Sequence, residues 1–361
     1  MNHSRFGATS RRSASFALMM FGRSLASPGH RLTACIALSV AGFASADCGA
    51  RTPIFAGDAA GPPTATPPCE DAATLAPNGV LFGGYGQIGD YLSDTWTWDG
   101  AAWSELQVAG PSGRVGAAMT SLCSKVILFG GNGDSNFGDT WSWNGSKWTQ
   151  LDVSGPSPRN GAAMAALGNS VVLFGGESTG QFFSDTWTWD GSIWTQLSVA
   201  GPPPRSNAVM AQLDGKLVLF GGLSMTGSDD ADTWTWDGTS WVEVPIAGPS
   251  ARNSAAMAPL EGKLVLFAGI DDAGVTLSDT WTWDATAWTE LALASPPARE
   301  SAVMVPVGGV LVLFGGESGE NLDASFDGTL SDTWTWDGTA WTLLAVTPHP
   351  GSREGAVMAS P

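Results

Sequence analysis

One arginine recurs at the same position of a repeated segment, and its chemistry suits the binding of anions. Each copy lies in a proline-containing segment directly before a run of small residues. The six copies are Arg114, Arg159, Arg205, Arg252, Arg299 and Arg353. A guanidinium group carries five N–H donors in a planar fork that matches carboxylate and phosphate groups. Six such groups around one axis would form a cationic ring that binds an anionic ligand.

The same arginines could instead be structural, because an aspartate also recurs once in every repeat. This aspartate opens a D-T-W segment, and its copies are Asp94, Asp139, Asp185, Asp232, Asp279 and Asp332. An arginine that pairs with this carboxylate would join neighbouring repeats and would leave no cation for a ligand. The sequence leaves both roles open.

Other catalytic chemistry has few candidates. Outside the first 46 residues His349 is the only histidine, so multi-histidine metal sites are excluded and a Ser-His-Asp triad would depend on His349 alone. Glycoside cleavage by two acids remains, but 34 acidic residues single out no pair. Acidic loops, such as 323–328, leave calcium as an alternative, although EF-hand spacing is missing. We therefore expect no catalytic residue, no metal site and no cofactor.

These residues belong to a unit that occurs six times. Its V-L-F-G-G segment places phenylalanines 45 to 47 residues apart, at Phe82, Phe129, Phe174, Phe220, Phe267 and Phe314. A period of that length indicates stacked supersecondary units, as in a propeller or a solenoid. Each unit holds a strand of small residues (a), the V-L-F-G-G strand (b), an alternating T-W-T-W strand (c) and a W-T-x-L strand (d). An Asp-Gly turn joins strands c and d, and Ala285 replaces its glycine in the fifth unit, which predicts the most strained turn there.

The tryptophans follow the same repeat. All 18 occupy three positions per unit, for example Trp96, Trp98 and Trp103 in the first. Stacking platforms for sugars or bases seldom recur identically in every unit, whereas core positions do. We therefore predict that the tryptophans form the core.

The double glycine after an apolar strand, the aromatic-x-aromatic-Asp strand and the tryptophan about five residues later resemble the blades of kelch-type β-propellers. The resemblance covers residues 67–361 and implies an all-β, six-bladed propeller of four-stranded antiparallel blades that acts as a binding module. Galactose oxidase has similar blades, but its copper site needs two His and two Tyr. Here only Tyr85 and Tyr91 occur, both in one loop.

The two ends of the repeat region predict how the ring closes. The C-terminus carries an extra strand a, residues 353–358, with no strand b after it. The N-terminal copy, residues 69–74, has Cys in place of Arg and Thr in place of Met. We expect the C-terminal strand to complete blade one, because propellers protect their strand edges in this way. The alternative is a truncated seven-bladed propeller.

The N-terminal region indicates export. Residues 1–46 contain arginines, then the apolar stretch 32–44, then Ala-Ser-Ala, and they predict a signal peptide cleaved after Ala46. Residues 47–66 form a Pro/Ala/Gly-rich tether before the propeller at 67–361. Cys48 is either the lipidated cysteine of a bacterial lipoprotein or the partner of Cys69 in a disulfide. We expect a secreted or cell-envelope protein that touches a membrane only through such a lipid anchor.

Charge and loop variation indicate the class of partner. Without residues 1–46 the chain has 11 basic and 34 acidic side chains, a net charge of −23, so nucleic acid is excluded as a partner. The b–c loops vary in length and sequence while the rest of each unit stays constant, which is typical of binding loops. In a four-stranded meander they share one face with the d–a loops. We predict a monomeric binding or scaffold module for a protein or carbohydrate ligand. The alternative is a carboxylate-based extracellular hydrolase or lyase acting on a carbohydrate.

Overall fold

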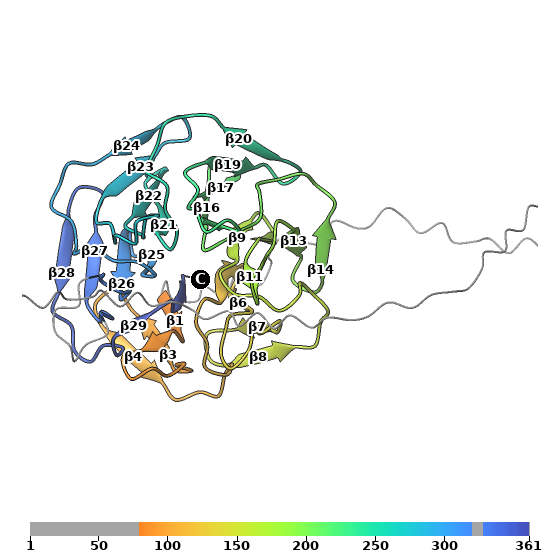
Figure 1. Ribbon diagram of the computed structural model, residues 1–361. Coiled ribbons are helices and arrows are strands. Elements are labelled where there is room, and N and C mark those ends of the chain that lie inside the picture. The colour runs from red at the N-terminus through yellow and green to blue at the C-terminus, as the bar shows by residue number, and fades with distance from the viewer. Residues whose placement is uncertain (1–78, 320–327, 361) are drawn as a thin grey trace, which may run out of the picture. The chain divides into compact units, whose positions relative to one another are not determined.

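The structure is a computed structural model that describes residues 79–319 and 328–360. The described residues form strands and no helix. Six four-stranded antiparallel sheets stand side by side around one axis (Figure 1). Each sheet is one repeat, and its strands run in the order a, b, c, d from the axis outward. The predicted six-bladed propeller is confirmed.

The strands of the six blades keep nearly constant lengths. Blade 1 holds β30 (Val357–Ala359), β1 (Gly79–Phe82), β3 (Thr95–Trp98) and β4 (Trp103–Leu106). Blade 2 holds β5 (Ala118–Leu122), β6 (Lys125–Phe129), β7 (Thr140–Trp143) and β8 (Trp148–Leu151). Blade 3 holds β9 (Ala163–Leu167), β10 (Ser170–Phe174), β13 (Thr186–Trp189) and β14 (Trp194–Leu197).

The second half of the ring repeats this arrangement. Blade 4 holds β16 (Val209–Leu213), β17 (Lys216–Phe220), β19 (Thr233–Trp236) and β20 (Trp241–Val244). Blade 5 holds β21 (Ala256–Leu260), β22 (Lys263–Phe267), β23 (Thr280–Trp283) and β24 (Trp288–Glu290). Blade 6 holds β25 (Val303–Val307), β26 (Val310–Phe314), β27 (Thr333–Trp336) and β28 (Trp341–Leu344).

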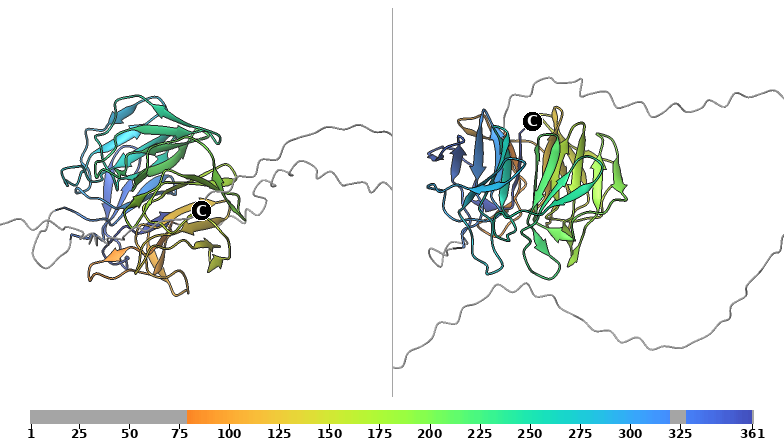
Figure 2. Two further views of the ribbon diagram at one scale, coloured as in Figure 1. Left: turned by 45° about the vertical axis from the view of Figure 1, so that its right-hand side comes forward. Right: turned by 90° about the horizontal axis from the view of Figure 1, so that it is seen from above.

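Short two-stranded ladders lie in the b–c and d–a loops. They pair β2 (Tyr85–Gly86) with β29 (Arg353–Glu354), β11 (Glu177–Ser178) with β12 (Gln181–Phe182), and β15 (Arg205–Ser206) with β18 (Leu223–Ser224). The edge-on view shows strands that run between two faces, with the longer loops projecting from one of them (Figure 2, right). We call the face formed by the b–c and d–a loops the loop face.

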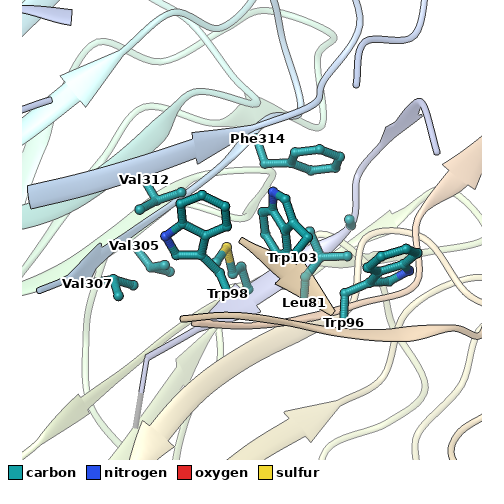
Figure 3. Close-up of a cluster of buried hydrophobic side chains, with 10 residues drawn as sticks. Leu81, Trp96, Trp98, Trp103, Val305, Val307, Val312 and Phe314 are labelled. Atoms are coloured by element: carbon teal, nitrogen blue, oxygen red, sulfur yellow. The ribbon is translucent and has the colours of Figure 1, made fainter. Parts of the chain in front are cut away.

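The tryptophans form the core between adjacent blades, as predicted. Trp98 and Trp103 of blade 1 pack against Val305, Val312 and Phe314 of blade 6 (Figure 3). The strand-d indole N–H of every blade donates to a threonine hydroxyl of the preceding blade at 2.9–3.1 Å. These bonds satisfy the buried indole donors and set the spacing between neighbouring sheets.

The ring closes between blades 6 and 1 through the C-terminal strand. β30 pairs with β1 in the register Phe82↔Val357 and Val80↔Ala359. A closed circle of backbone hydrogen bonds also surrounds the axis, with N···O distances of 2.7–3.0 Å. It joins Gly116, Gly161, Asn207, Ser254, Ser301 and Gly355, each to its neighbour. Because Gly355 bonds to both Ser301 and Gly116, no place remains for a seventh blade. The alternative of a truncated seven-bladed propeller is therefore wrong.

The c–d turn of blade 5 carries the strain expected from its sequence. Ala285 adopts a φ of 72°, whereas glycine takes the equivalent left-handed position in the other five blades, at φ values of 92–101°. A side chain in this region costs about 1 kcal/mol relative to glycine.

The predicted signal peptide (1–46), the tether (47–66), Cys48, Cys69 and the acidic segment 320–327 lie outside the described residues. Cys123, in the turn between β5 and β6, is disulfide-bonded. The Cys48–Cys69 bridge and the lipidation of Cys48 stay predictions. Within 79–319 and 328–360, no helix is long and apolar enough to cross a membrane.

Candidate functional site

The six repeat arginines lie inside the protein and not at the channel mouth. Each residue is at most 2 % exposed. In every blade Nη1 and Nη2 donate to the two carboxylate oxygens of the D-T-W aspartate at 2.5–2.7 Å and 2.8–3.0 Å. Nη1 also donates to a backbone carbonyl at 2.8–3.0 Å. The guanidinium donors are thus committed within the protein.

Each arginine joins two blades. The backbone of Arg159 bonds to blade 2 through Phe137 O and Gly131 N, at 3.0 and 2.9 Å. Its side chain bonds to Gly175 O and Asp185 of blade 3. Arg353 repeats this pattern across the seam, with its backbone on blade 6 and its side chain on Asp94 of blade 1. The blade-locking alternative is confirmed.

The expected cationic ring is therefore corrected: Arg114, Arg159, Arg205, Arg252, Arg299 and Arg353 offer no free charge to a ligand. The sequence argument located them correctly just before strand a, but it left open whether the guanidinium points to the axis or between the blades. Burial raises the pKa of each partner aspartate, yet hydrogen bonds from arginine and from an indole N–H outweigh it and hold the pKa below its usual value. The aspartates therefore stay ionised and paired at neutral pH.

Each arginine is followed by a residue that varies from blade to blade: Val115, Asn160, Ser206, Asn253, Glu300 and Glu354. Of these, Val115, Asn160 and Glu354 line the channel mouth on the loop face. Next comes the circle of backbone hydrogen bonds, whose members have φ values of 54–62°. A cavity of about 320 Å³ opens here, lined mainly by backbone and small side chains and by Asn160 and Glu354. The mouth is polar and contains no repeat arginine.

Polar side chains tie the loops of adjacent blades together around this mouth. Asn160 donates to Glu177 Oε1 at 2.6 Å and to Asn136 Oδ1 at 2.9 Å. Asn253 donates to Asp229 Oδ1 at 2.8 Å, and the Asp229 backbone N–H donates to Asp272 Oδ1 at 2.5 Å. These bonds fix the loops relative to one another, so the loop face is preorganised for a partner.

Glu300 is the most perturbed carboxyl group of the loop face. Burial, followed by the charges of Glu317 and Asp229, raises its pKa to about 7. Glu300 and Glu317 are backbone partners, in the place where blade 3 pairs Asn160 with Glu177. An amide–acid pair in one blade is therefore an acid–acid pair in another. The sequence shows this difference as R-N-G (159–161) against R-E-S (299–301). It could have been recognised only if the residue after arginine was known to pair with the b–c loop.

Replacing Glu300 with Asn should stabilise the protein at pH 8 and leave its stability unchanged at pH 4. The pKa of Glu300 is higher in the folded than in the unfolded state, so the protonated side chain carries no penalty at low pH, and its ionisation destabilises the fold as pH rises through about 7. We expect a gain on the order of 1–2 kcal/mol at pH 8, allowing for partial solvent screening. Urea unfolding at both pH values measures it, with Glu177→Gln as the control. Equal effects at both pH values would contradict the acid–acid pair.

Tyr85, Tyr91 and His349, which the sequence offered as further candidates for chemistry, contact near neighbours in the chain. Tyr85 and Tyr91 contact each other edge to face within blade 1, and His349 Nδ1 lies 2.8 Å from Pro350 O. In the described part of the chain no three His, Cys, Asp or Glu side chains are arranged to hold a metal ion. Calcium at the acidic loops, such as 323–328, stays a prediction.

Comparison with known families agrees with this architecture. A family model described as the KLHDC2/KLHL20/DRC7 Kelch-repeats domain matches residues 70–207 and again 143–293. Together the two matches span more than half of the chain. No curated protein matches it.

Proposed function

Because the chain belongs to the kelch-repeat propellers, we propose that it is a binding or scaffold module that recognises a protein or glycan ligand through its loop face. One observation carries the proposal: a closed, uniform ring presents loops that differ from blade to blade on a single face. The b–c loop spans residues 130–139 in blade 2 and 315–332 in blade 6. A constant scaffold with variable loops is the usual arrangement for specific recognition.

The buried arginines and tryptophans support this role indirectly. Arg–Asp pairs and indole–threonine bonds recur in all six blades. The residues that are the same in every repeat therefore stabilise the ring. Recognition is then left to residues that vary, and these lie in the loops. The glycan and protein classes differ in what they need: a glycan requires polar groups and an open aromatic face, whereas a protein segment requires an apolar patch with a polar rim.

Immobilised protein, attached through the face opposite the loops, can be screened against random peptides and a glycan array. Bound ligands should be lost when Met225 and Ile88 of the loop face are changed to Asp. They should survive the matched changes Ile193→Asp and Leu343→Asp in the c–d turn and on strand d. Ligands that are lost only with the second pair of changes would place the recognition surface away from the loops. A screen in which no ligand binds would contradict the proposal.

We further propose that the protein is exported and works outside the cytoplasm, at the cell envelope if Cys48 is lipidated. The mature chain should begin at Asp47, or at Cys48 carrying a lipid, and should lack residues 1–46. Intact-mass spectrometry of exported protein, with a Cys48→Ser variant as the control for lipidation, measures this. Exported protein that retains residues 1–46 would contradict the signal peptide.

A second function has one specific observation in its favour. Glu300, with a pKa raised to about 7 by burial and then by Glu317 and Asp229, has the protonation behaviour of a general acid beside a carboxylate. An extracellular carbohydrate hydrolase or lyase would use such a pair. Release of reducing ends from a polysaccharide panel, abolished by Glu300→Gln and retained by Glu177→Gln, would support this alternative. An absence of release across the panel would leave the binding module.

A further inference from the structure

Large apolar side chains are exposed mainly on the loop side of the propeller. Among the described residues, six of the nine exposed large hydrophobics lie in b–c or d–a loops. Ile88 is 89 % exposed in the b–c loop of blade 1, Met225 is 69 % exposed in that of blade 4, and Val275 is 54 % exposed in that of blade 5. Blades 1 and 4 lie opposite each other in a ring of six, so the loops that carry these side chains lie on opposite sides of the axis.

The lysines are confined to one face of the propeller. All four lysines of the chain lie in a–b or c–d turns or directly after them, on the face opposite the loops: Lys125, Lys147, Lys216 and Lys263. Within the described residues, the b–c and d–a loops contain no lysine, and their six arginines are cancelled by six aspartates. The loops carry further carboxylates beyond these pairs, so the loop face is strongly negative.

The negative charge is concentrated in the sector of blades 4 to 6, next to Met225 and Val275. Asp229 and Asp272 are joined by a hydrogen bond, and Glu300 lies close enough to Asp229 and Glu317 to be affected by both charges. Burial and then the charges of Asp272 and Asp271 raise the pKa of Asp229, although Asn253 donates a hydrogen bond to it. A cation placed here would relieve this repulsion, and the fixed loops would pay no large ordering cost.

We propose, resting on the function proposed above, that the loop face binds a basic and partly apolar segment of a protein partner. Lysine or arginine side chains of the partner lie over the carboxylates of Asp229, Asp272 and Glu300. Its apolar side chains pack on Met225 and Val275 on one side of the mouth and on Ile88 on the other. The ligand proposed here is cationic, whereas the six arginines suggested an anionic one. The charge of those arginines is neutralised inside the protein by the paired aspartates.

The carboxylates and the apolar side chains contribute differently to the affinity of this complex. The carboxylates attract the basic segment over a distance and select its sign, so their contribution should fall as salt screens them. The apolar loop tips supply buried area, which screening by salt leaves in place. An acidic partner is repelled, and a neutral glycan gains nothing from the charges, so both become distinct outcomes of the test.

Three 12-residue peptides of equal leucine and phenylalanine content, with the other positions Lys, Ser or Glu, serve as probes with the full-length chain. Fluorescence anisotropy at low and high salt should show binding of the lysine peptide, weakened at least tenfold by the higher salt, and no binding of the glutamate peptide. The triple variant Asp229→Asn, Asp272→Asn, Glu300→Gln should weaken binding of the lysine peptide at least tenfold. The asparagine side chains keep the acceptors that the loop hydrogen bonds need.

The matched control, Asp214→Asn, Glu243→Gln, Glu261→Gln, makes the same change in net charge away from the loop face and should alter affinity less than twofold. Ile88→Ser with Met225→Ser should weaken binding about fivefold at both salt concentrations, whereas Ile193→Ser with Leu343→Ser should not. Equal losses in the two charge triples would overturn the inference, because attraction would then follow net charge alone.

The results also separate this inference from the function on which it rests. Binding of the serine or glutamate peptide, or of an arrayed glycan, at the loop face would overturn the basic-segment inference and keep the binding module. If no peptide and no glycan binds at the loop face, both are overturned.

Discussion

Deletion of residues 353–361 is expected to lower the free energy of unfolding by on the order of 5 kcal/mol or more. The deletion removes the pairing of β30 with β1, the Arg353–Asp94 ion pair and the Gly355 member of the backbone circle. It also exposes the core that Met358 covers between blades 1 and 6. Breaking a buried ion pair alone costs about 3–5 kcal/mol, and a buried methionine contributes about 2 kcal/mol.

Thermal unfolding measures this loss, which corresponds to a decrease of about 10–20 °C in Tm for a domain of this size. Removal of Pro361 alone is the control and should leave Tm unchanged. A truncated chain that unfolds at the wild-type temperature would show that the seam between blades 6 and 1 is open, because only a frayed terminus can be lost without cost.

Replacement of Arg205 by Met is expected to destabilise the protein by about 3–5 kcal/mol at pH 7. The methionine keeps most of the side-chain volume, but it leaves the Asp232 carboxylate half-buried without its guanidinium partner. The double variant Arg205→Met, Asp232→Asn should recover part of this loss, since the amide oxygen can still accept the Trp234 indole N–H. Chemical denaturation of the single and double variants at pH 7 and pH 4 measures both effects.

The pH dependence separates a stranded charge from lost packing. Without the guanidinium, burial raises the pKa of Asp232 above its unfolded value, so protonation at low pH relieves the penalty and the loss is smaller at pH 4. Arg353→Met should also be strongly destabilising but should cost less than Arg205→Met, because the seam repeats the contact with the D-T-W aspartate but lacks the second contact of Arg205, with Asp230 at 3.4 Å. A cost that is small and equal at both pH values would contradict a buried pair.

The blade architecture was predictable because every local signal is repeated six times. The b strand at 171–174 is continuously apolar and is buried, and the T-W-T-W strand pairs with it in the register that the alternation requires. The extra C-terminal strand, 353–358, was visible as a copy without a blade of its own. Its role as the inner strand of blade 1 follows from the need to protect the β1 edge.

The orientation of the arginines was not predictable from position alone. A residue just before strand a lies near the axis whether its side chain turns inward or sideways, and the sequence offers a partner for either choice. Burial of a charged group decides this, because a guanidinium that makes two bonds to one carboxylate can be enclosed, whereas six unpaired cations at one mouth would repel one another. The aspartate of each D-T-W segment is the partner that makes burial possible. This pairing is the alternative to a cationic ring that the sequence left open.

The pairing of Glu300 with Glu317 could not be predicted for a related reason. The residue after each arginine varies from Val115 to Glu354, and nothing in the sequence shows that this position faces the b–c loop. The backbone circle that places it there depends on left-handed residues, of which Asn207, Ser254 and Ser301 carry side chains that give no warning of that conformation. Only the ring geometry brings Asp229, Asp272 and Glu300 into one sector.

Hydrogen–deuterium exchange of the inner strands tests the closed ring, on which the whole loop face depends. The account predicts that the amides of β30 that bond to β1 are protected as strongly as those of β9 and β16, with exchange limited by global unfolding. The Gly355 amide, which donates to Ser301, should share this protection. Rapid exchange throughout 353–360 in a protein whose other inner strands are protected would contradict closure and the six-bladed ring.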